Sequence, residues 1–261
     1  MTGRSRARDR SRPSDRSRPS GGALAWAPWS ALGGQWFDAA DGTSGSPVSA
    51  WTARGATAVA TQGTVANQPA APVTNASLGD ELASAFDGAD RLVSSTALDL
   101  SAAWTICAVL STAALKNEHG VFRLAASEST GGGGICCYAV LDGRLVIGSA
   151  DTSWYRVCNP GIVTGGVVVL AKCAGTSESI SVEVGAISGG TIAWTAQTLG
   201  ALSGTFAMPA ASGQYLVLGG GWSSSTSFLS GNLGLIGAVG RDIDAAETAS
   251  LKGYLAGRFA V

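Results

Sequence analysis

Short hydrophobic stretches separated by glycine-rich turns dominate the chain from residue 35 onward. The clearest is ICCYAVLDGRLVIGSA (135–150), in which Asp142-Gly143 joins two apolar runs; Asp-Gly is typical of a tight hairpin turn. The stretch SISVEVGAIS (179–188) alternates strictly, with three branched apolar residues on one face and Glu183 on the other. Both patterns predict antiparallel β-strands.

The other predicted strands share apolar and β-branched residues at close spacing, with turn residues between them; they cover 104–112, 120–127, 166–174, 214–221 and 231–240. Together the pattern gives about ten strands, which is typical of a sandwich or jelly roll. The sequence therefore predicts an all-β, antiparallel jelly-roll sandwich.

One helix is predicted, at residues 242–259 near the end of the sequence. Asp244 is its expected N-cap, and Glu247 three residues later completes a capping box. Three apolar side chains, those of Leu251, Tyr254 and Leu255, then fall on one face. We expect this short C-terminal α-helix to lie on the sandwich and cover an edge.

Composition supports one β-rich domain and indicates where the protein acts. The 261 residues include 37 glycines, and 46% of them are hydrophobic, which is enough for a large core. Only 13% are charged, against about 25% in typical soluble domains. We expect an extracellular or particle-bound protein. No secretory signal and no membrane insertion are expected, because no apolar run has the required length.

The net charge of −1 hides a strong asymmetry. Residues 1–20 carry a balance of +5, so the rest of the chain carries −6. The repeat RSRPSDRSRPS (10–20) has no apolar residue to bury, and its prolines oppose helix and strand, so a disordered or extended arm is predicted at 1–22. A linker follows at 23–34, and the jelly-roll domain spans 35–261.

Three roles are open for this arm: a solvated tail, an anchor on carboxylates of a partner protein, and a binder of nucleic acid. An anchoring role is favoured over nucleic acid because no aromatic residues interleave with the arginines and the body is acidic. The linker tryptophans are expected to need a surface to pack on. The anchoring residues would be Arg4, Arg6, Arg8, Arg10, Arg12, Arg16, Arg18, Trp26 and Trp29.

The cysteines argue against a zinc site. There are five, with no Cys-x-x-Cys pair, and His119 is the single histidine. Zinc sites need spaced Cys and His ligands. Most of the cysteines lie in apolar runs, so buried free thiols are expected. Disulfides are the alternative, which the spacing does not decide.

The chain resembles the concanavalin A-like, or laminin G-type, jelly rolls, in the version found in structural proteins of tailed phages, prophages and gene-transfer agents. The resemblance lies in WFDAADGTSGSPVSAWTARGATAVATQGTVANQPA (36–70), ASAFDGADRLVSS (83–95) and GLIGAVGRDIDAAETASLKGYLAGRF (234–259). It covers roughly residues 33–260 and implies a virion component.

The resemblance also suggests a role for the first of these segments. It implies that Trp36 and Trp51 pack in the fold and that Asp38 and Asp41 form turns by accepting backbone N–H bonds. A calcium site at these two carboxylates is the alternative, because Ca²⁺ takes oxygen ligands. No other cofactor and no other metal is expected.

Catalytic motifs are absent from the sequence. Glucanases of this fold carry Glu-x-Asp-x-x-Glu on a strand, whereas Glu178 and Glu183 are five apart and so on opposite strand faces. His119 has no Gly-x-Ser-x-Gly nucleophile elbow to serve. We therefore expect that the chain is not an enzyme.

Two aromatic segments are candidates for ligand contact. DTSWYRVCNPG (151–161) and GGGWSSSTSF (219–228) are predicted loops, and exposed aromatic faces next to amide and guanidinium donors suit sugar rings. The alternative is that the tryptophans pack beneath the loops. The candidate ligand-binding residues are Trp154, Tyr155, Arg156, Asn159 and Trp222.

The sequence thus predicts a phage virion structural protein, either a capsid decoration or spike or a tail-fibre component. The arm would anchor it to other virion proteins, and a lectin-like domain on the virion surface would bind host polysaccharide or stabilise the shell. A homo-oligomer is expected. Two alternatives stay open: a coat protein whose basic arm binds nucleic acid, and a carbohydrate-active enzyme with an unrecognised site that would use Glu183 or His119.

Overall fold

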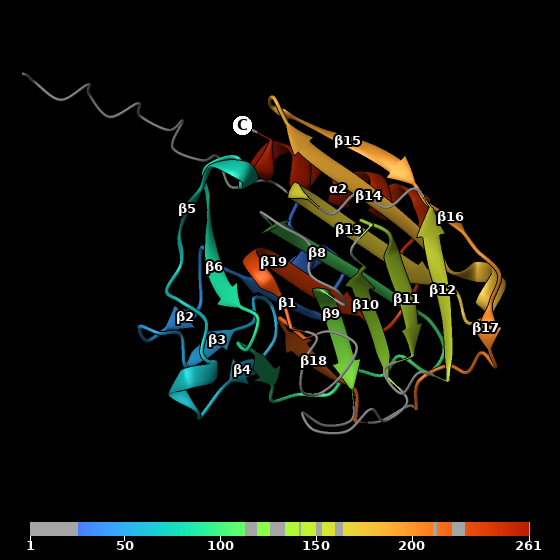
Figure 1. Cartoon of the computed structure of the whole chain (residues 1–261), viewed down its shortest axis with the longest axis horizontal. Helices are drawn as coiled ribbons and strands as arrows, with labels where there is room; N and C mark the ends of the chain where they lie inside the picture. Colours follow the sequence, from blue (N-terminus) through green and yellow to red (C-terminus); the bar gives the residue numbers. More distant parts are fainter. Residues whose placement is uncertain are drawn as a thin grey trace, which may run out of the picture.

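The computed structural model describes residues 26–112, 119–125, 134–140, 142–149, 153–159, 164–210, 213–220 and 228–260. Two antiparallel β-sheets face each other in this part of the chain, and one longer helix packs against the assembly (Figure 1). The predicted all-β, antiparallel jelly-roll sandwich with a short C-terminal α-helix is confirmed. The predicted arm at 1–22 and Trp222 lie outside the described residues.

The first sheet has eight strands, and β1 pairs with β19 beside its main path. In spatial order these strands are β15 (Thr191–Ala196), β14 (Ser181–Ser188), β13 (Gly165–Cys173), β8 (Trp104–Thr112), β19 (Ser230–Val239), β6 (Glu81–Asp87) and β5 (Val73–Asn75), with β1 (Gln35–Asp38) alongside.

The second sheet has eleven strands, and β17 pairs with β12 beside its main path. In order they are β16 (Thr198–Leu199), β12 (Trp154–Asn159), β11 (Leu145–Ser149), β10 (Ile135–Ala139), β9 (His119–Ala125), β18 (Tyr215–Leu218), β7 (Leu92–Ser94), β4 (Val59–Thr61), β3 (Ala50–Thr52) and β2 (Thr43–Ser44), with β17 (Ser203–Gly204) alongside.

The predicted hairpin is confirmed in β10 and β11. Tyr138 lies opposite Val146, and the N–H of Val140 donates to the carbonyl of Arg144 at 2.9 Å. Gly143 has a φ of +83°, a conformation that glycine adopts without steric strain. The predicted strands at 104–112, 166–174 and 231–240 also match β8, β13 and β19 within one residue at each end.

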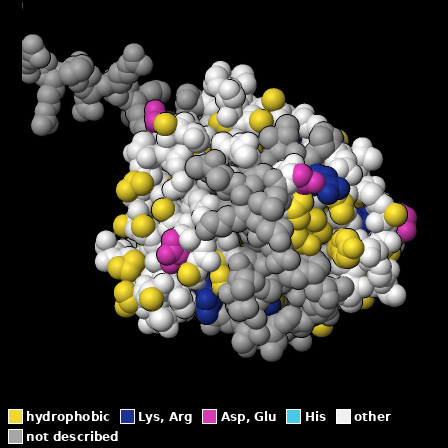
Figure 2. Space-filling view, viewed as in Figure 1, with side chains coloured by type: hydrophobic (Ala, Val, Ile, Leu, Met, Phe, Trp, Pro, Cys, Tyr) yellow, Lys and Arg dark blue, Asp and Glu magenta, His cyan; other side chains and the backbone are white. Residues whose placement is uncertain are grey.

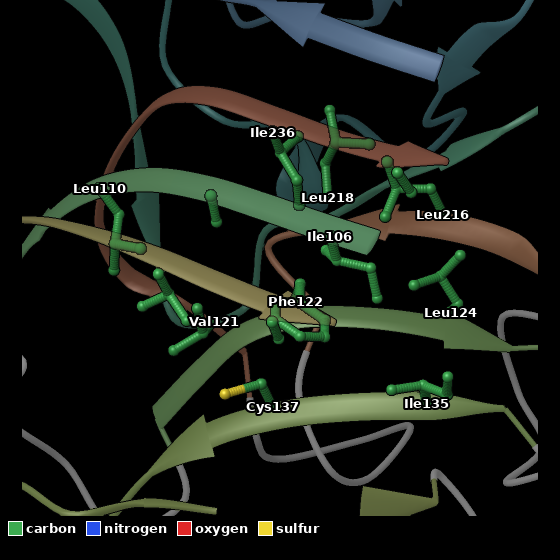
Figure 3. Packing of buried hydrophobic residues seen from close by; sticks show 14 of the residues in the cluster. Ile106, Leu110, Val121, Phe122, Leu124, Ile135, Cys137, Leu216, Leu218 and Ile236 are labelled. Atoms are coloured by element: carbon green, nitrogen blue, oxygen red, sulfur yellow. The ribbon is translucent and has the colours of Figure 1, made fainter. Parts of the chain in front are cut away.

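The main core fills the space between the sheets. Figure 3 shows Ile106 and Leu110 of β8 beside Val121, Phe122 and Leu124 of β9. All nine residues of β8 are buried. Its alternate residues Cys107 and Val109 belong to a second core on the other side of the sheet, which explains why its sequence is apolar almost throughout.

The second core lies beneath helix α2 (Ala245–Phe259). Asp244 accepts a hydrogen bond from the N–H of Glu247 at 2.8 Å, and the reciprocal bond completes the predicted capping box. The sequence predicted that this helix covers an edge of the sandwich, and that prediction is wrong. The helix covers the outer face of the first sheet. Its buried residues share a hydrophobic cluster with residues of the inner strands β8, β13 and β19.

The predicted linker is ordered where the structure describes it. Pro28 begins a four-residue helix, α1 (Pro28–Ala31), and Gly33 and Gly34 lead into β1. A Cβ on Gly34 would lie 2.2 Å from the carbonyl oxygen of Ala238, so a side chain does not fit there. Three single-turn 3₁₀ helices complete the described elements: η1 (Val65–Asn67), η2 (Ala76–Leu78) and η3 (Ser177–Ser179).

All five cysteines are buried and unpaired by disulfides, as predicted. Burial raises the pKa of Cys107 to about 12, which makes it a poor nucleophile. In the part of the chain that the structure describes, no helix is both long and apolar enough to cross a bilayer.

Candidate functional site

The first predicted ligand segment is mostly a strand, not a loop. Residues 154–159 form β12, so their side chains alternate between two faces. Trp154 is only 1% exposed, belongs to the main core, and donates from Nε1 to the carbonyl of Ala207 at 3.1 Å. Arg156 shares this inner side and is half-buried. Trp154 therefore packs, which corrects the loop prediction and leaves it no face for a ligand.

The outer side of β12 keeps two of the predicted residues accessible. Tyr155 is 37% exposed, and Asn159 is exposed at the end of the strand. Hydrophobic side chains gather on this face over β11 and β12 (Figure 2). The other predicted ligand residue, Trp222, lies outside the described residues, as do all seven arginines of the arm.

The linker tryptophans find their packing surface within the same chain. Trp26 and Trp29 are half-buried, and their ring centroids lie 6.3 and 5.7 Å from that of Tyr254 on α2. Trp29 meets Tyr254 edge to face, a geometry favoured for aromatic pairs.

A cavity of about 520 Å³ opens beside these rings, and we call it the α1–α2 pocket. Its volume falls in the range of about 300–1,000 Å³ usual for ligand sites. It combines aromatic, cationic and anionic side chains from segments distant in sequence. The lining residues are Ala27, Trp29, Ala40, Arg54, Glu81, Tyr254 and Arg258.

The pocket is built on Asp38 at the end of β1. Asp38 is fully buried, and its Oδ1 accepts the N–H of Ala40 at 2.9 Å, which confirms its predicted role in the turn. Both carboxylate oxygens also accept hydrogen bonds from Arg258, at 2.5 and 2.6 Å. Trp51 donates from Nε1 to the Asp38 carbonyl at 2.9 Å, and both Trp36 and Trp51 are fully buried, as predicted.

Arg258 makes further bonds along the pocket wall. Its Nη1 donates to the Tyr254 hydroxyl at 2.9 Å, and its Nε donates to Glu81 Oε2 at 3.2 Å. Burial alone would lower the pKa of Arg258, but the hydrogen bonds and negative charge of Asp38 raise it above its ordinary value. Burial raises the pKa of Tyr254, and the positive charge of Arg258 opposes part of that rise. Both groups keep their protons at neutral pH.

Arg54 forms the more accessible cationic wall. Its Nε lies 3.3 Å from Asp38 Oδ2, and its Nη2 lies 3.1 Å from Asp41 Oδ2. The guanidinium sits 4.5 Å from the Trp29 ring centroid, in a cation–π contact. With 29% of its side chain exposed, Arg54 can contact both the wall and a ligand.

The site offers little support for a bound cation. Among the described residues, no group of three or more His, Cys, Asp and Glu side chains is arranged to hold a metal ion. A calcium ion at Asp38 and Asp41 would have to displace a guanidinium from Asp38, because Arg258 bonds both of its carboxylate oxygens.

The sequence reasoning missed four of these pocket residues: Arg54, Glu81, Tyr254 and Arg258. A partial signal was present, because Tyr254 and Arg258 are four residues apart on a predicted helix and so share a face. Nothing in the sequence indicates that this helix meets Asp38, which lies 220 residues before Arg258.

Comparison with known proteins places the fold but no family. No protein-family model matches the sequence, and no curated protein matches it. Among solved structures, a GH54 α-L-arabinofuranosidase soaked with a cyclic sulfate inhibitor is similar, with a TM-score of 0.58 and 13% identity over 82% of this chain and 51% of that one. An arabinofuranosidase complexed with arabinofuranosyl-α-1,2-xylobiose is similar, with a TM-score of 0.54 and 15% identity over 82% and 52%.

A Trypanosoma rangeli sialidase in complex with sialic acid is also similar, with a TM-score of 0.51 and 11% identity over 84% of this chain and 32% of that one. This chain thus spans about a third to a half of the length of these structures. At these identities the likeness shows the fold alone. It supports the jelly-roll part of the sequence resemblance and gives no support to its phage part.

The expectation that the chain is not an enzyme is corrected by these comparisons. It depended on the absence of a glucanase motif from the sequence, yet the similar structures are an arabinofuranosidase of family GH54, another arabinofuranosidase and a sialidase. A missing glucanase motif therefore does not separate this chain from carbohydrate-active enzymes of the same fold.

Proposed function

We propose that this chain is a carbohydrate-active β-sandwich that holds a short saccharide in the α1–α2 pocket. The observation that carries the proposal is the pocket itself, in which the Trp29 and Tyr254 rings stand beside the charged groups of Arg54 and Glu81. Aromatic side chains present an apolar body to the C–H faces of a sugar ring, while charged groups bond its hydroxyls.

The charged groups are held in place before a ligand arrives. Asp38 and Tyr254 fix Arg258, and Arg258 in turn fixes Glu81. Trp29 and Asp41 hold Arg54 from two sides. Preorganised groups lose little conformational entropy on binding, which favours affinity for a small polar ligand.

The fold likeness supports the same substrate class. Two of the similar structures are complexes with sugars, one with arabinofuranosyl-α-1,2-xylobiose and one with sialic acid. Binding is the step that a lectin-like domain and a glycosidase share, so the proposal covers both, and only a turnover assay separates them.

Binding is tested with the full chain on a glycan array, followed by calorimetry on the best ligand. We expect Trp29→Ala to weaken binding by tenfold or more, since an aromatic contact contributes about 1–3 kcal/mol. Trp26→Ala is the matched control, because Trp26 contacts Tyr254 but does not line the pocket. If the two variants weaken binding equally, or if no glycan binds, the proposal that the α1–α2 pocket binds a saccharide is wrong.

Turnover is tested by incubating the bound glycan with the chain and measuring reducing ends. Glu81→Gln keeps the shape of the side chain and removes its carboxylate. Turnover that is lost in this variant would make the protein a glycosidase with Glu81 in its site. Binding without turnover would make it a lectin-like module.

The virion role is a separate proposal that rests on the sequence resemblance and on the charge split between the +5 segment and the −6 body. We propose that residues 1–22 anchor the domain to a particle protein. Deleting these residues should abolish incorporation into particles while the domain stays folded; unchanged incorporation would overturn the role of the arm.

A further inference from the structure

A second hollow, which we call the β6 groove, lies at the far end of strand β6 from the α1–α2 pocket. It has a volume of about 400 Å³ and a largely apolar lining. Val65 at the start of η1 is 66% exposed, which is unusual for a large hydrophobic side chain. The lining residues are Pro47, Val65, Ala66, Gln68, Ala70, Ala85, Phe86, Asp87 and Asp90.

Two carboxylates stand at the groove. Asp90 Oδ2 accepts the N–H of Asp87 at 2.9 Å, and Asp87 Oδ1 accepts the N–H of Ala89 at 2.8 Å. Asp90 is only 5% exposed, and burial, assisted by the charge of Asp87, raises its pKa to about 6. A buried carboxylate of this kind gains stability when a cation arrives beside it.

The arm has the complementary chemistry. The segment RSRPSDRSRPS (10–20) carries four arginines and two prolines. Proline-rich segments favour the extended polyproline II conformation and dock on apolar grooves with little loss of conformational entropy. Guanidinium groups form two-pronged, charge-assisted hydrogen bonds with carboxylates.

The arm is also long enough to reach. Glu81 at the start of β6 lines the pocket beside Ala27, and Asp87 at its end lines the groove. The two residues are six positions apart along the strand, which corresponds to about 20 Å. Arg18 precedes Ala27 by nine residues, which span up to about 30 Å when extended. A tethered segment acts at millimolar effective concentration, so the chain's own arm is favoured over that of a second copy.

We propose that the β6 groove binds the Arg-Ser-Pro segment, residues 10–20, of the same chain. The prolines lie on the apolar lining around Val65 and Phe86, and arginines pair with Asp87 and Asp90. The arm is then held on the domain until a surface richer in carboxylates competes for it. This inference is independent of the sugar site.

The test measures the distance between the arm and the groove. Spin labels are placed on the full chain at Ser14→Cys and at Thr64→Cys, beside the groove; the native cysteines are buried and react slowly. Labelled protein is diluted into unlabelled protein, so that only distances within one chain are recorded by double electron–electron resonance. We expect a narrow, short-distance population.

Two variants should abolish that population: Asp87→Asn with Asp90→Asn, and serine replacement of Arg10, Arg12, Arg16 and Arg18. Asp142→Asn is the matched control, since Asp142 is an exposed carboxylate in the β10–β11 turn, and it should change nothing. The same broad distribution in the parent and in the variants would overturn the proposal. A short distance that disappears on dilution would overturn it too, because it would arise between copies.

A second readout does not depend on the labels. Trypsin cuts after arginine, so a docked arm is protected. Losing one charge-assisted contact should speed cleavage of the arm on the order of tenfold. Equal cleavage rates in the parent and in the double asparagine variant would contradict docking, provided that circular dichroism shows both to be folded.

Discussion

Asp38 and Arg258, 220 residues apart in the chain, form a two-pronged ion pair that joins the first strand of the sandwich to its last helix. Asp38 is fully buried, and Arg258 is 10% exposed. The pair fixes the wall of the α1–α2 pocket, because Arg258 also bonds Tyr254 and Glu81. The geometry of the pocket therefore depends on the contact between β1 and α2 that this ion pair makes.

Removing one partner of this pair should destabilise the fold strongly. Arg258→Ala leaves the buried Asp38 carboxylate without its main partner, and breaking a buried pair in this way costs about 3–5 kcal/mol. Asp38→Ala with Arg258→Ala should lose less than the sum of the single changes, because neither charge is left stranded. Urea denaturation of the parent, the Asp38→Ala variant, the Arg258→Ala variant and the double variant measures the coupling free energy. Additive losses would mean that the two groups do not act as a unit.

A pH effect is expected from Asp90 in the full chain with Arg10, Arg12, Arg16 and Arg18 replaced by serine, because no guanidinium of the arm then lowers the pKa of this carboxyl. Its pKa is raised to about 6 from an ordinary value near 3.8, chiefly by burial. As pH rises from 4 to 6 the unfolded chain releases this proton while the folded chain keeps it, so the folded state loses stability. The loss approaches about 3 kcal/mol above pH 6.

Asp90→Asn should remove this loss while keeping an oxygen acceptor for the Asp87 N–H. In the chain that carries the four serine replacements, the free energy of unfolding measured in urea should be higher with Asp90→Asn than without it, and the difference should grow between pH 4 and 7. A constant difference across this range would show that Asp90 titrates normally.

Two glycine substitutions should have opposite effects on stability. A Cβ on Gly237 of β19 would lie 2.1 Å from the buried ring of Trp36. Gly237→Ala should therefore cost about 1–3 kcal/mol, as overpacking does. Gly253 of α2 is exposed with open space around its Cβ position, so Gly253→Ala should gain about 0.5–1 kcal/mol. Thermal unfolding followed by circular dichroism measures both; a destabilised Gly253→Ala would contradict the helix assignment.

The sequence predicts the parts of this fold that local chemistry determines. Asp142-Gly143 determines a hairpin turn, and Asp244 with Glu247 determines where the helix begins, because each signal acts within a few residues. The sequence also predicted the burial of Trp36 and Trp51, although this came from the family resemblance.

The failures have a common physical origin. Trp154 was assigned to a loop because turn residues flank it, whereas pairing with β11 makes residues 154–159 a strand and turns the ring into the core. The pocket was missed because Trp29, Arg54, Glu81 and Arg258 come from four segments that are distant in sequence and adjacent only in the folded domain. Contacts between distant segments leave no periodic signal in either one.

The contribution of the planar guanidinium of Arg54 to binding can be separated from the contribution of its positive charge. Arg54→Lys keeps a cation near Asp41 but loses the planar group that stacks on Trp29 and the fork that could bond two sugar hydroxyls together. We expect at least a tenfold loss of affinity for the glycan identified on the array. Stability should change by less than about 1 kcal/mol, because lysine keeps the positive charge and Arg258 still pairs with the buried Asp38. Arg144→Lys is the matched control, because Arg144 also pairs with a neighbouring carboxylate, Asp142, and lies outside the pocket.

Calorimetry measures the affinity of both variants for the glycan, and urea denaturation measures their free energies of unfolding. An Arg54→Lys protein that binds as tightly as the Arg144→Lys protein would show that binding does not need the planar guanidinium of Arg54.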